Sequence, residues 1–278
     1  MILYRGFNLT LDIIDQQAFF EVTDQERTVF KKENQKIQSM IKTKMETELD
    51  FPVGANGDID GAKIMEDWFP NKKADIFISH SHNDRRTAER LAIWLQREMN
   101  LSVFIDSVVW GSADELLKKI DNQYSLLREK DGNATYDYNT RNYTTSHVHM
   151  MLSAALSEVI YNSECLIFLN TPHSLSIRES KGQKTNSPWI FNELKIAGTI
   201  EKKIPRRKSH LIKEELHHRD IFNKSETIPS FSYPVGPELM KMKSINKSDL
   251  VYWHSQIGEK NKNWHPLDIL YSEVISNE

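Results

Sequence analysis

The stretch Ala74–Asp84, with the sequence ADIFISHSHND, decides the fold that we expect for this chain. A short run of apolar residues ends abruptly in small polar and titratable ones, which is typical of a buried strand leaving a parallel sheet. Open parallel sheets bind their ligands just outside the carboxyl ends of their strands. The polar end of this stretch is therefore the first place to look for a functional site.

Two further apolar runs, Leu101–Asp106 and Cys165–Asn170, have the length and composition of buried strands. Residues at helical spacing form apolar stripes between successive runs, and Ser187-Pro188 offers a capping hydroxyl followed by proline at the start of another helix. This alternation predicts an α/β fold, with a flavodoxin-like parallel sheet, helices on both of its faces, and N- and C-terminal additions.

The remaining sequence carries weaker patterns. Residues 24–48 predict a charged helix, and short helices are predicted over Leu250–Gln256 and Pro266–Ile275. Arg128–Tyr143 has no apolar periodicity and is interpreted as a loop inserted in the second crossover. The sequence thus predicts three parts: an N-terminal extension packed on the core over residues 1–66, the main α/β domain over 67–236, and a C-terminal helical extension over 237–278.

Composition limits the cellular compartments and the classes of partner that we expect for this protein. The net charge of −3 gives no electrostatic reason to expect a nucleic-acid partner. No apolar stretch approaches the roughly 20 residues of a membrane-spanning helix, and the N-terminus lacks the pattern of a signal peptide. The single cysteine, Cys165, excludes an internal disulfide framework and fits a reducing compartment. We expect a soluble cytoplasmic protein with no nucleic-acid or membrane partner.

A second place for chemistry is the helix that follows Ser187-Pro188, where Trp189 precedes Glu193 by four residues. Side chains at this spacing project from the same face of a helix. A carboxylate there can face the end of the strand that finishes at Ser79. From the spacing alone, the better interpretation of Glu193 is a solvated helix residue, which is the usual situation of glutamate.

Three segments resemble the sequence boxes of Toll/interleukin-1 receptor (TIR) domains. The run Asp75–Asp84, with its Ser-His-Ser core, resembles the first box, and Ser187–Leu194 resembles the third, in which a tryptophan precedes a glutamate by four. Asp106–Ser112 resembles the second box more loosely, because Trp110 stands where the usual proline precedes Gly111. The resemblance covers residues 73–201 and is closest to the bacterial NAD-processing type found in Thoeris-like antiphage defence.

The resemblance implies an enzyme that cleaves the nicotinamide–ribose bond of NAD and makes ADP-ribose or a cyclic ADP-ribose-type signal. NAD is then the substrate, and no bound cofactor is expected. Other TIR domains, through self-assembly, and a separate effector protein that senses the product are the implied partners. Glu193 is implied as the catalytic residue, and the residues implied to border the NAD site are Ser79, His80, Ser81, Asp106, Trp110 and Trp189.

The chemistry explains why one glutamate can suffice. Breaking the bond builds positive charge on the ribose, and a carboxylate held nearby stabilises that charge. Nicotinamide departs neutral, so a strong general acid is unnecessary. This interpretation requires the Glu193 carboxylate to open into the same cleft as the strand end at Ser79.

Other interpretations stay open at this stage. The chain could be a non-catalytic TIR–TIR interaction adaptor, or a nucleoside deoxyribosyltransferase, which has a similar layered fold. Ser79 and Ser81 could make turn hydrogen bonds, and a helix cap is the better interpretation of Asp84. Trp110 could stack on the substrate, anchor an interface or pack on the sheet edge. We expect no metal site, because the histidines lack partners at metal-binding spacings.

Overall fold

The computed structural model describes residues 5–11, 20–47, 60–69, 73–109, 113–130, 133–175, 183–200, 232–257 and 263–274. The chain forms two compact units. The sheet unit comprises Met1–Phe30, Lys73–Ile105 and Val159–Glu278, and the helical unit comprises Lys31–Lys72 and Asp106–Glu158.

The sheet unit is built on five parallel strands flanked by helices, which confirms the predicted α/β fold. The strands follow the order β3-β2-β6-β1-β9 across the sheet, and every neighbouring pair is parallel. Strands β2, β3 and β6 fall within the three predicted apolar runs. The strands are β1 (Arg5–Thr10), β2 (Ile76–Ser79), β3 (Val103–Phe104), β6 (Cys165–Asn170) and β9 (Lys243–Ile245).

Two of these strands come from the segments that were predicted as extensions at the ends of the chain. Strand β1 lies between β6 and β9, so residues 5–10 are part of the sheet rather than of an extension packed on it. Its buried residues Phe7 and Leu9 alternate with Asn8 and Thr10, a strand pattern that was missed because it is short. Strand β9 also belongs to the sheet, and three residues are too few for a recognisable pattern.

The strand order departs from the flavodoxin-like order at one place. The run β3-β2-β6 reproduces the second, first and third strands of that order. The fourth position is occupied by β1, which comes from the N-terminal end of the chain, and β9 occupies the fifth. The sheet is therefore completed by two segments that are distant in sequence from its central part.

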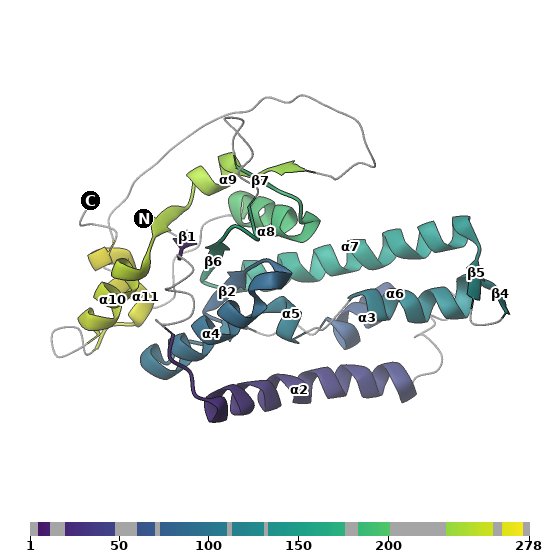
Figure 1. The fold of residues 1–278 in the computed structure, drawn as a ribbon, viewed down its shortest axis with the longest axis horizontal. Coiled ribbons are helices and arrows are strands. Elements are labelled where there is room, and N and C mark those ends of the chain that lie inside the picture. Colours follow the sequence, from purple (N-terminus) through teal and green to yellow (C-terminus); the bar gives the residue numbers. More distant parts are fainter. Residues whose placement is uncertain are drawn as a thin grey trace. The chain divides into compact units, whose positions relative to one another are not determined.

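The connections between strands locate the switch point of the sheet. The chain leaves β2 toward one edge and leaves β6 toward the other. Because crossovers between parallel strands are almost always right-handed, opposite directions put the connecting helices on opposite faces. Helices α4 (Arg85–Met99) and α8 (Pro188–Thr199) accordingly lie on opposite sides of the strands (Figure 1). The carboxyl ends of β2 and β6 thus form the topological switch point, where open α/β sheets bind ligands.

Local sequence explains where these two helices begin and end. The Ser187 hydroxyl accepts a hydrogen bond of 3.2 Å from the N–H of Ile190, and Pro188 occupies the first turn of α8, as predicted. Helix α4 ends at Asn100, which adopts the left-handed conformation with φ of 53°. Its N–H bonds to the carbonyl of Gln96 and closes the last turn.

Short elements complete the sheet unit and include both helices predicted near the C-terminus. Trp253 of α10 is fully buried and donates its indole N–H to the Pro266 carbonyl at 2.8 Å. The elements are a 3-10 turn (His82–Asp84), the antiparallel pair β7 (Lys184–Thr185) and β8 (Tyr233–Pro234), α9 (Gly236–Met240), α10 (Lys247–Gln256) and α11 (Pro266–Ile269), which continues as a π-helical turn (Leu270–Val274).

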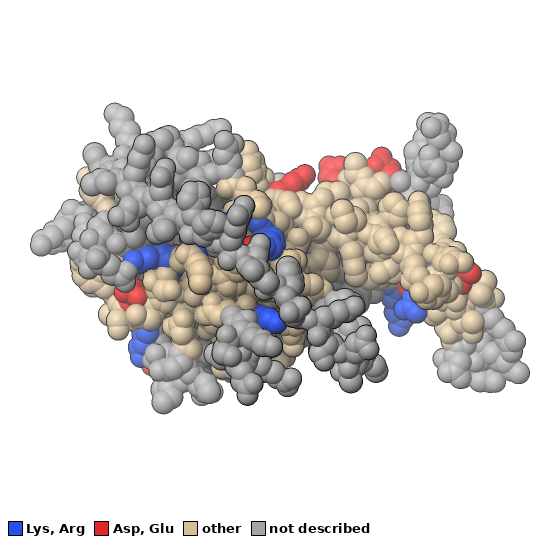
Figure 2. All heavy atoms as spheres, turned by 90° about the horizontal axis from the view of Figure 1, so that it is seen from above, with Lys and Arg blue, Asp and Glu red and all other residues tan. Residues whose placement is uncertain are grey.

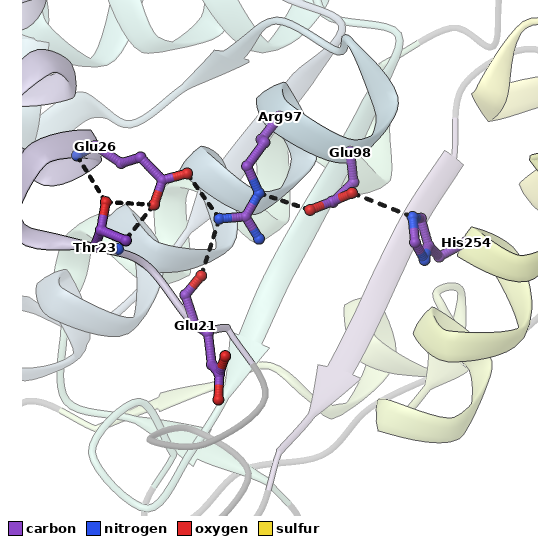
Figure 3. A network of polar contacts seen from close by, with 6 residues as sticks. All are labelled: Glu21, Thr23, Glu26, Arg97, Glu98 and His254. Carbon is purple, nitrogen blue, oxygen red and sulfur yellow. Dashed lines mark hydrogen bonds and ion pairs between the residues drawn. The ribbon is translucent and has the colours of Figure 1, made fainter.

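Helix α2 (Asp24–Thr47), predicted as a charged helix, begins with a capping box in the sheet unit. The Glu26 carboxylate accepts the N–H of Thr23 at 2.8 Å, and the Thr23 hydroxyl accepts the N–H of Glu26 at 3.2 Å. Arg97 of α4 donates to the Glu26 carboxylate at 2.8 Å and to the Glu98 carboxylate at 2.6 Å. These residues form the Arg97 network with Glu21 and His254 (Figure 3), which links the start of α2 to α4.

The helical unit corrects the loop predicted over Arg128–Tyr143. Strands β4 (Leu126–Lys130) and β5 (Asn133–Tyr136) pair antiparallel, and a helix starts at Tyr138. The Asp137 carboxylate accepts the N–H and the hydroxyl of Thr140, both at 2.7 Å, and these bonds lower its pKa. A helix can begin without an apolar stripe when its first turn is capped in this way. The elements are α3 (Gly61–Trp68), α5 (Asp106–Val109), α6 (Ala113–Ile120), a π-helical turn (Asp121–Ser125), β4 (Leu126–Lys130), β5 (Asn133–Tyr136) and α7 (Tyr138–Asn162).

None of the helices in the described part of the chain has the length and apolar character that crossing a bilayer requires. Figure 2 shows the charged side chains of the described residues as several separate groups on the face that it presents.

Candidate functional site

The site is built around one contact between the two predicted segments. Ser79 is the last residue of β2, and Glu193 lies in the second turn of α8. The Ser79 hydroxyl donates a hydrogen bond of 2.5 Å to the Glu193 carboxylate. Both side chains are buried, with 0% and 2% of their surface exposed. The structure therefore brings together the carboxyl end of β2 and the glutamate of α8, which are 114 residues apart in the sequence.

The length of this bond indicates a charge-assisted hydrogen bond, for which O···O distances of about 2.5–2.7 Å are usual. It orients the Glu193 carboxylate, because one of its oxygens is tied to a strand end in the middle of the sheet. The Ser79 hydroxyl hydrogen points to Glu193 and cannot be donated to a substrate phosphate at the same time. In this geometry Ser79 supports the carboxylate rather than binding a phosphate.

The burial of Glu193 differs from the open cleft that the sequence-based interpretation required. Only 2% of its surface is exposed, so the carboxylate does not open to solvent in this conformation. A substrate can contact the Glu193 carboxylate only if the side chains around it move apart.

A second buried contact joins the two sides of the switch point. Thr171 directly follows β6, and its hydroxyl donates to the Asp84 carboxylate at 2.6 Å. The Ser174 hydroxyl closes the turn after β6. It donates to the Thr171 carbonyl at 3.0 Å and accepts from the Thr171 N–H at 2.8 Å. All three residues are buried. This cluster fixes the chain after β6 relative to the start of α4.

The same contact corrects the prediction that Asp84 is a helix cap. Asp84 stands at the N-cap position of α4, but its side chain makes no capping hydrogen bond. Its carboxylate is turned to Thr171 instead. Ser81 does make the expected turn bond, since its hydroxyl accepts the N–H of Asn83 at 3.3 Å.

The other predicted site residues have different environments. His80 and Ser81 are buried beside Ser79, and Trp189 is half-buried on α8. Asp106 is half-buried at the start of α5 and belongs to the helical unit, whereas the contacts of Glu193 and Thr171 described above lie within the sheet unit. Trp110 lies outside the described residues.

Sequence reasoning missed Thr171 and Ser174. The signal was present, because Thr171–Ser174 is a polar stretch directly after the third apolar run, just as the Ser-His-Ser stretch follows the first. Applying the same rule to every strand end would have found both residues.

Metal binding and thiol chemistry find no support in the described part of the chain. It contains no group of three or more His, Cys, Asp or Glu side chains that could hold a metal ion. Cys165 is a free, buried cysteine inside β6.

No family model, curated protein or solved structure matches the chain. The fold, the geometry of the site and the motifs of the sequence are therefore what points to a function.

Proposed function

We propose that this protein is a TIR-type enzyme that cleaves the nicotinamide–ribose bond of NAD, with Glu193 as the catalytic carboxylate. The observation that carries the proposal is the Ser79–Glu193 contact at the switch point of a parallel sheet. The product is ADP-ribose or a cyclic ADP-ribose-type signal, and the setting is cytoplasmic antiphage defence. The TIR-like motifs around Ser79 and Glu193 support the choice of NAD.

The bond-breaking step needs one carboxylate placed beside the ribose. The bond between the ribose carbon and the ring nitrogen breaks, and its electron pair leaves with the nitrogen, so nicotinamide departs neutral. The Glu193 carboxylate stabilises the positive charge that develops on the ribose. Water then adds to the ribose carbon and loses a proton, or an oxygen or nitrogen of the same molecule does so and closes a ring.

Ser79 has a positioning role in this proposal. Its hydrogen bond holds one oxygen of the Glu193 carboxylate, so the orientation of the charge is set before the substrate arrives. Preorganisation of this kind lowers the cost of stabilising the transition state. Because Glu193 is buried, binding of NAD requires an opening step, and self-assembly with other TIR domains is one way to stabilise the open form.

The decisive experiment incubates the purified protein with NAD and resolves the products by mass spectrometry. Wild-type protein should release nicotinamide, and Glu193→Gln should not. The matched control is Glu89→Gln, because Glu89 is also a buried glutamate of the sheet unit, 5% exposed, but lies on α4. Intact NAD with wild-type protein across a wide range of protein concentrations would refute the proposal.

One observation favours a second candidate, the non-catalytic interaction adaptor. A buried carboxylate that is satisfied by a neighbouring hydroxyl is also what a purely structural glutamate looks like. An adaptor would leave NAD intact and would lose stability, rather than activity, in Glu193→Gln. Exchange of bases between added deoxynucleosides would instead identify a deoxyribosyltransferase.

A further inference from the structure

A polar patch on strand β1 lies on the same face of the sheet as the Ser79–Glu193 contact. In the register of the parallel ladders, Ser79 pairs with Phe168, Phe168 with Asn8, and Asn8 with Ser244. Residues paired in this way project from the same face of a sheet, and so do residues two apart along a strand. We call this group the β1 polar patch, and it comprises Asn8, Thr10, Asn170 and Ser244.

Asn8 is the buried member of this patch. It is 8% exposed, and its Oδ1 atom is buried and has no hydrogen-bond partner within the described part of the chain. Leaving a buried acceptor unpaired is unfavourable, and such groups in native proteins call for an explanation. Packing does not supply one, because an apolar side chain of the same size would fill the position without that cost.

The residues beside Asn8 are open to solvent on two sides. Thr10, toward the carboxyl edge, and Ser244, on the neighbouring strand, are both exposed, and Asn170 is half-buried. The opposite side is closed, because Gly6 is packed against the Met242 side chain, which a Cβ at that position would approach to 2.8 Å. The patch is therefore open toward the carboxyl ends of the strands, on the side of the switch point, and a ligand that contacts the buried Oδ1 must displace the side chains that cover it.

We infer that Asn8 binds the carboxamide of the nicotinamide ring, an assignment that rests on the proposed function. The Asn8 amide and the carboxamide are complementary, because each offers one acceptor oxygen beside one donor N–H₂. The unpaired Oδ1 accepts from the carboxamide nitrogen, and the Asn8 nitrogen donates to the carboxamide oxygen. The pair thus supplies the hydrogen-bond partner that Oδ1 lacks among the described residues.

Distance favours this end of the dinucleotide. Asn8 is two strands away from Ser79, which corresponds to about 10 Å between their backbones. The carboxamide is separated from the reacting ribose carbon by one aromatic ring, whereas the adenine is at the far end of the molecule. When the ribose lies beside Glu193, the nicotinamide ring extends across the strand ends from β2 toward β1.

The test compares NAD with acetylpyridine adenine dinucleotide, in which a methyl group replaces the carboxamide N–H₂. Wild-type protein should show a KM about tenfold higher for the analogue, because Oδ1 is then left unpaired in the complex. Asn8→Leu should raise the KM for NAD by a similar factor and should no longer distinguish the two substrates. The control is Ser255→Ala, an exposed serine of α10 outside the β1 polar patch, which should behave as the wild type.

Thermal unfolding adds a readout that separates binding from structure. Removing a buried Oδ1 that has no partner among the described residues should leave the Tm of Asn8→Leu unchanged or higher. A lower Tm would show that Asn8 has a structural partner, and equal KM values for the two dinucleotides in wild-type protein would exclude the carboxamide contact; either result overturns the inference. Should Asn8→Leu fail to fold, the wild-type comparison decides alone. If wild-type protein releases no nicotinamide from NAD, the proposed function itself has failed and the Asn8 assignment falls with it.

Discussion

Glu193 and Glu26 are two carboxylates of the sheet unit that are held in contrasting ways. Glu193 is buried and shares a short hydrogen bond with Ser79. Glu26 is partly exposed and accepts from the backbone and the hydroxyl of Thr23 and from Arg97, each at 2.8 Å. The hydrogen bond from Arg97, followed by those from Thr23, lowers the pKa of Glu26 from 4.5 to about 2.

The contrast shows that the number of hydrogen bonds does not identify a functional carboxylate. Glu26 closes a capping box and links α2 to α4, so its contacts account for its presence. Glu193 lies at the switch point of the sheet, where a charge can act on a ligand. Position in the fold and burial, rather than the number of partners, separate the two.

The largest effect that we expect comes from Glu193→Gln. Loss of the negative charge should slow nicotinamide release by at least about 10²- to 10³-fold, the range for removal of one preorganised electrostatic group. The folded structure should persist, because the amide is nearly isosteric and can still accept from Ser79. The measurements are product formation by mass spectrometry and Tm; a large drop in Tm with little change in rate would make the residue structural.

Ser79→Ala should have the next largest effect. The variant removes the hydroxyl that donates to a buried carboxylate, which should cost about 1.5–3 kcal/mol of unfolding free energy. Nicotinamide release should also slow, though less than in Glu193→Gln, because the charge remains but loses its orientation. Urea unfolding at pH 7 measures the first effect. Unchanged stability would mean that the Ser79–Glu193 bond contributes nothing to the fold.

Thr171→Val should be milder. It removes the donor to the Asp84 carboxylate and the acceptor for the His173 and Ser174 N–H groups, without changing the shape of the side chain. Asp84 already stands at the N-cap position of α4, where its carboxylate can cap the first turn instead, so we expect a loss of about 1–2 kcal/mol. Combining it with Asp84→Asn in a double-mutant cycle checks the assignment; additive effects would show that the two side chains do not act as a pair.

The smallest effect should come from Glu26→Gln and should depend on pH. Because the folded-state pKa of Glu26 is depressed, its contribution to stability is present above its ordinary value of 4.5 and is lost as the pH falls toward about 2. The Tm of the variant should therefore lie slightly below that of the wild type at pH 7, and the difference should vanish near pH 2. High salt should also reduce the difference, since the pair is partly exposed. A difference that grows on acidification would contradict this account.

Local patterns in the sequence were enough for the central part of the fold. Strands β2 and β6 and the start of α8 at Ser187 depend on short-range features: apolar runs, a capping hydroxyl and a proline at the first turn. The candidate carboxylate at position 193 could also be predicted from a motif of a few residues. These features are encoded by neighbours along the chain, so no knowledge of distant contacts was needed.

Contacts between distant segments decided the rest. Strand β1 is defined by its pairing with β6 and β9, and the three residues of β9 form a strand only because β1 lies beside them. The Ser79–Glu193 bond and the Thr171–Asp84 bond are likewise consequences of chain segments that meet after folding, and so is the burial of Asn8 Oδ1 without a partner among the described residues. The sequence by itself determined which segments become strands and helices and which residues can do chemistry. Only the tertiary structure decided which of them meet and which are buried, because burial and pairing depend on partners that are far apart along the chain.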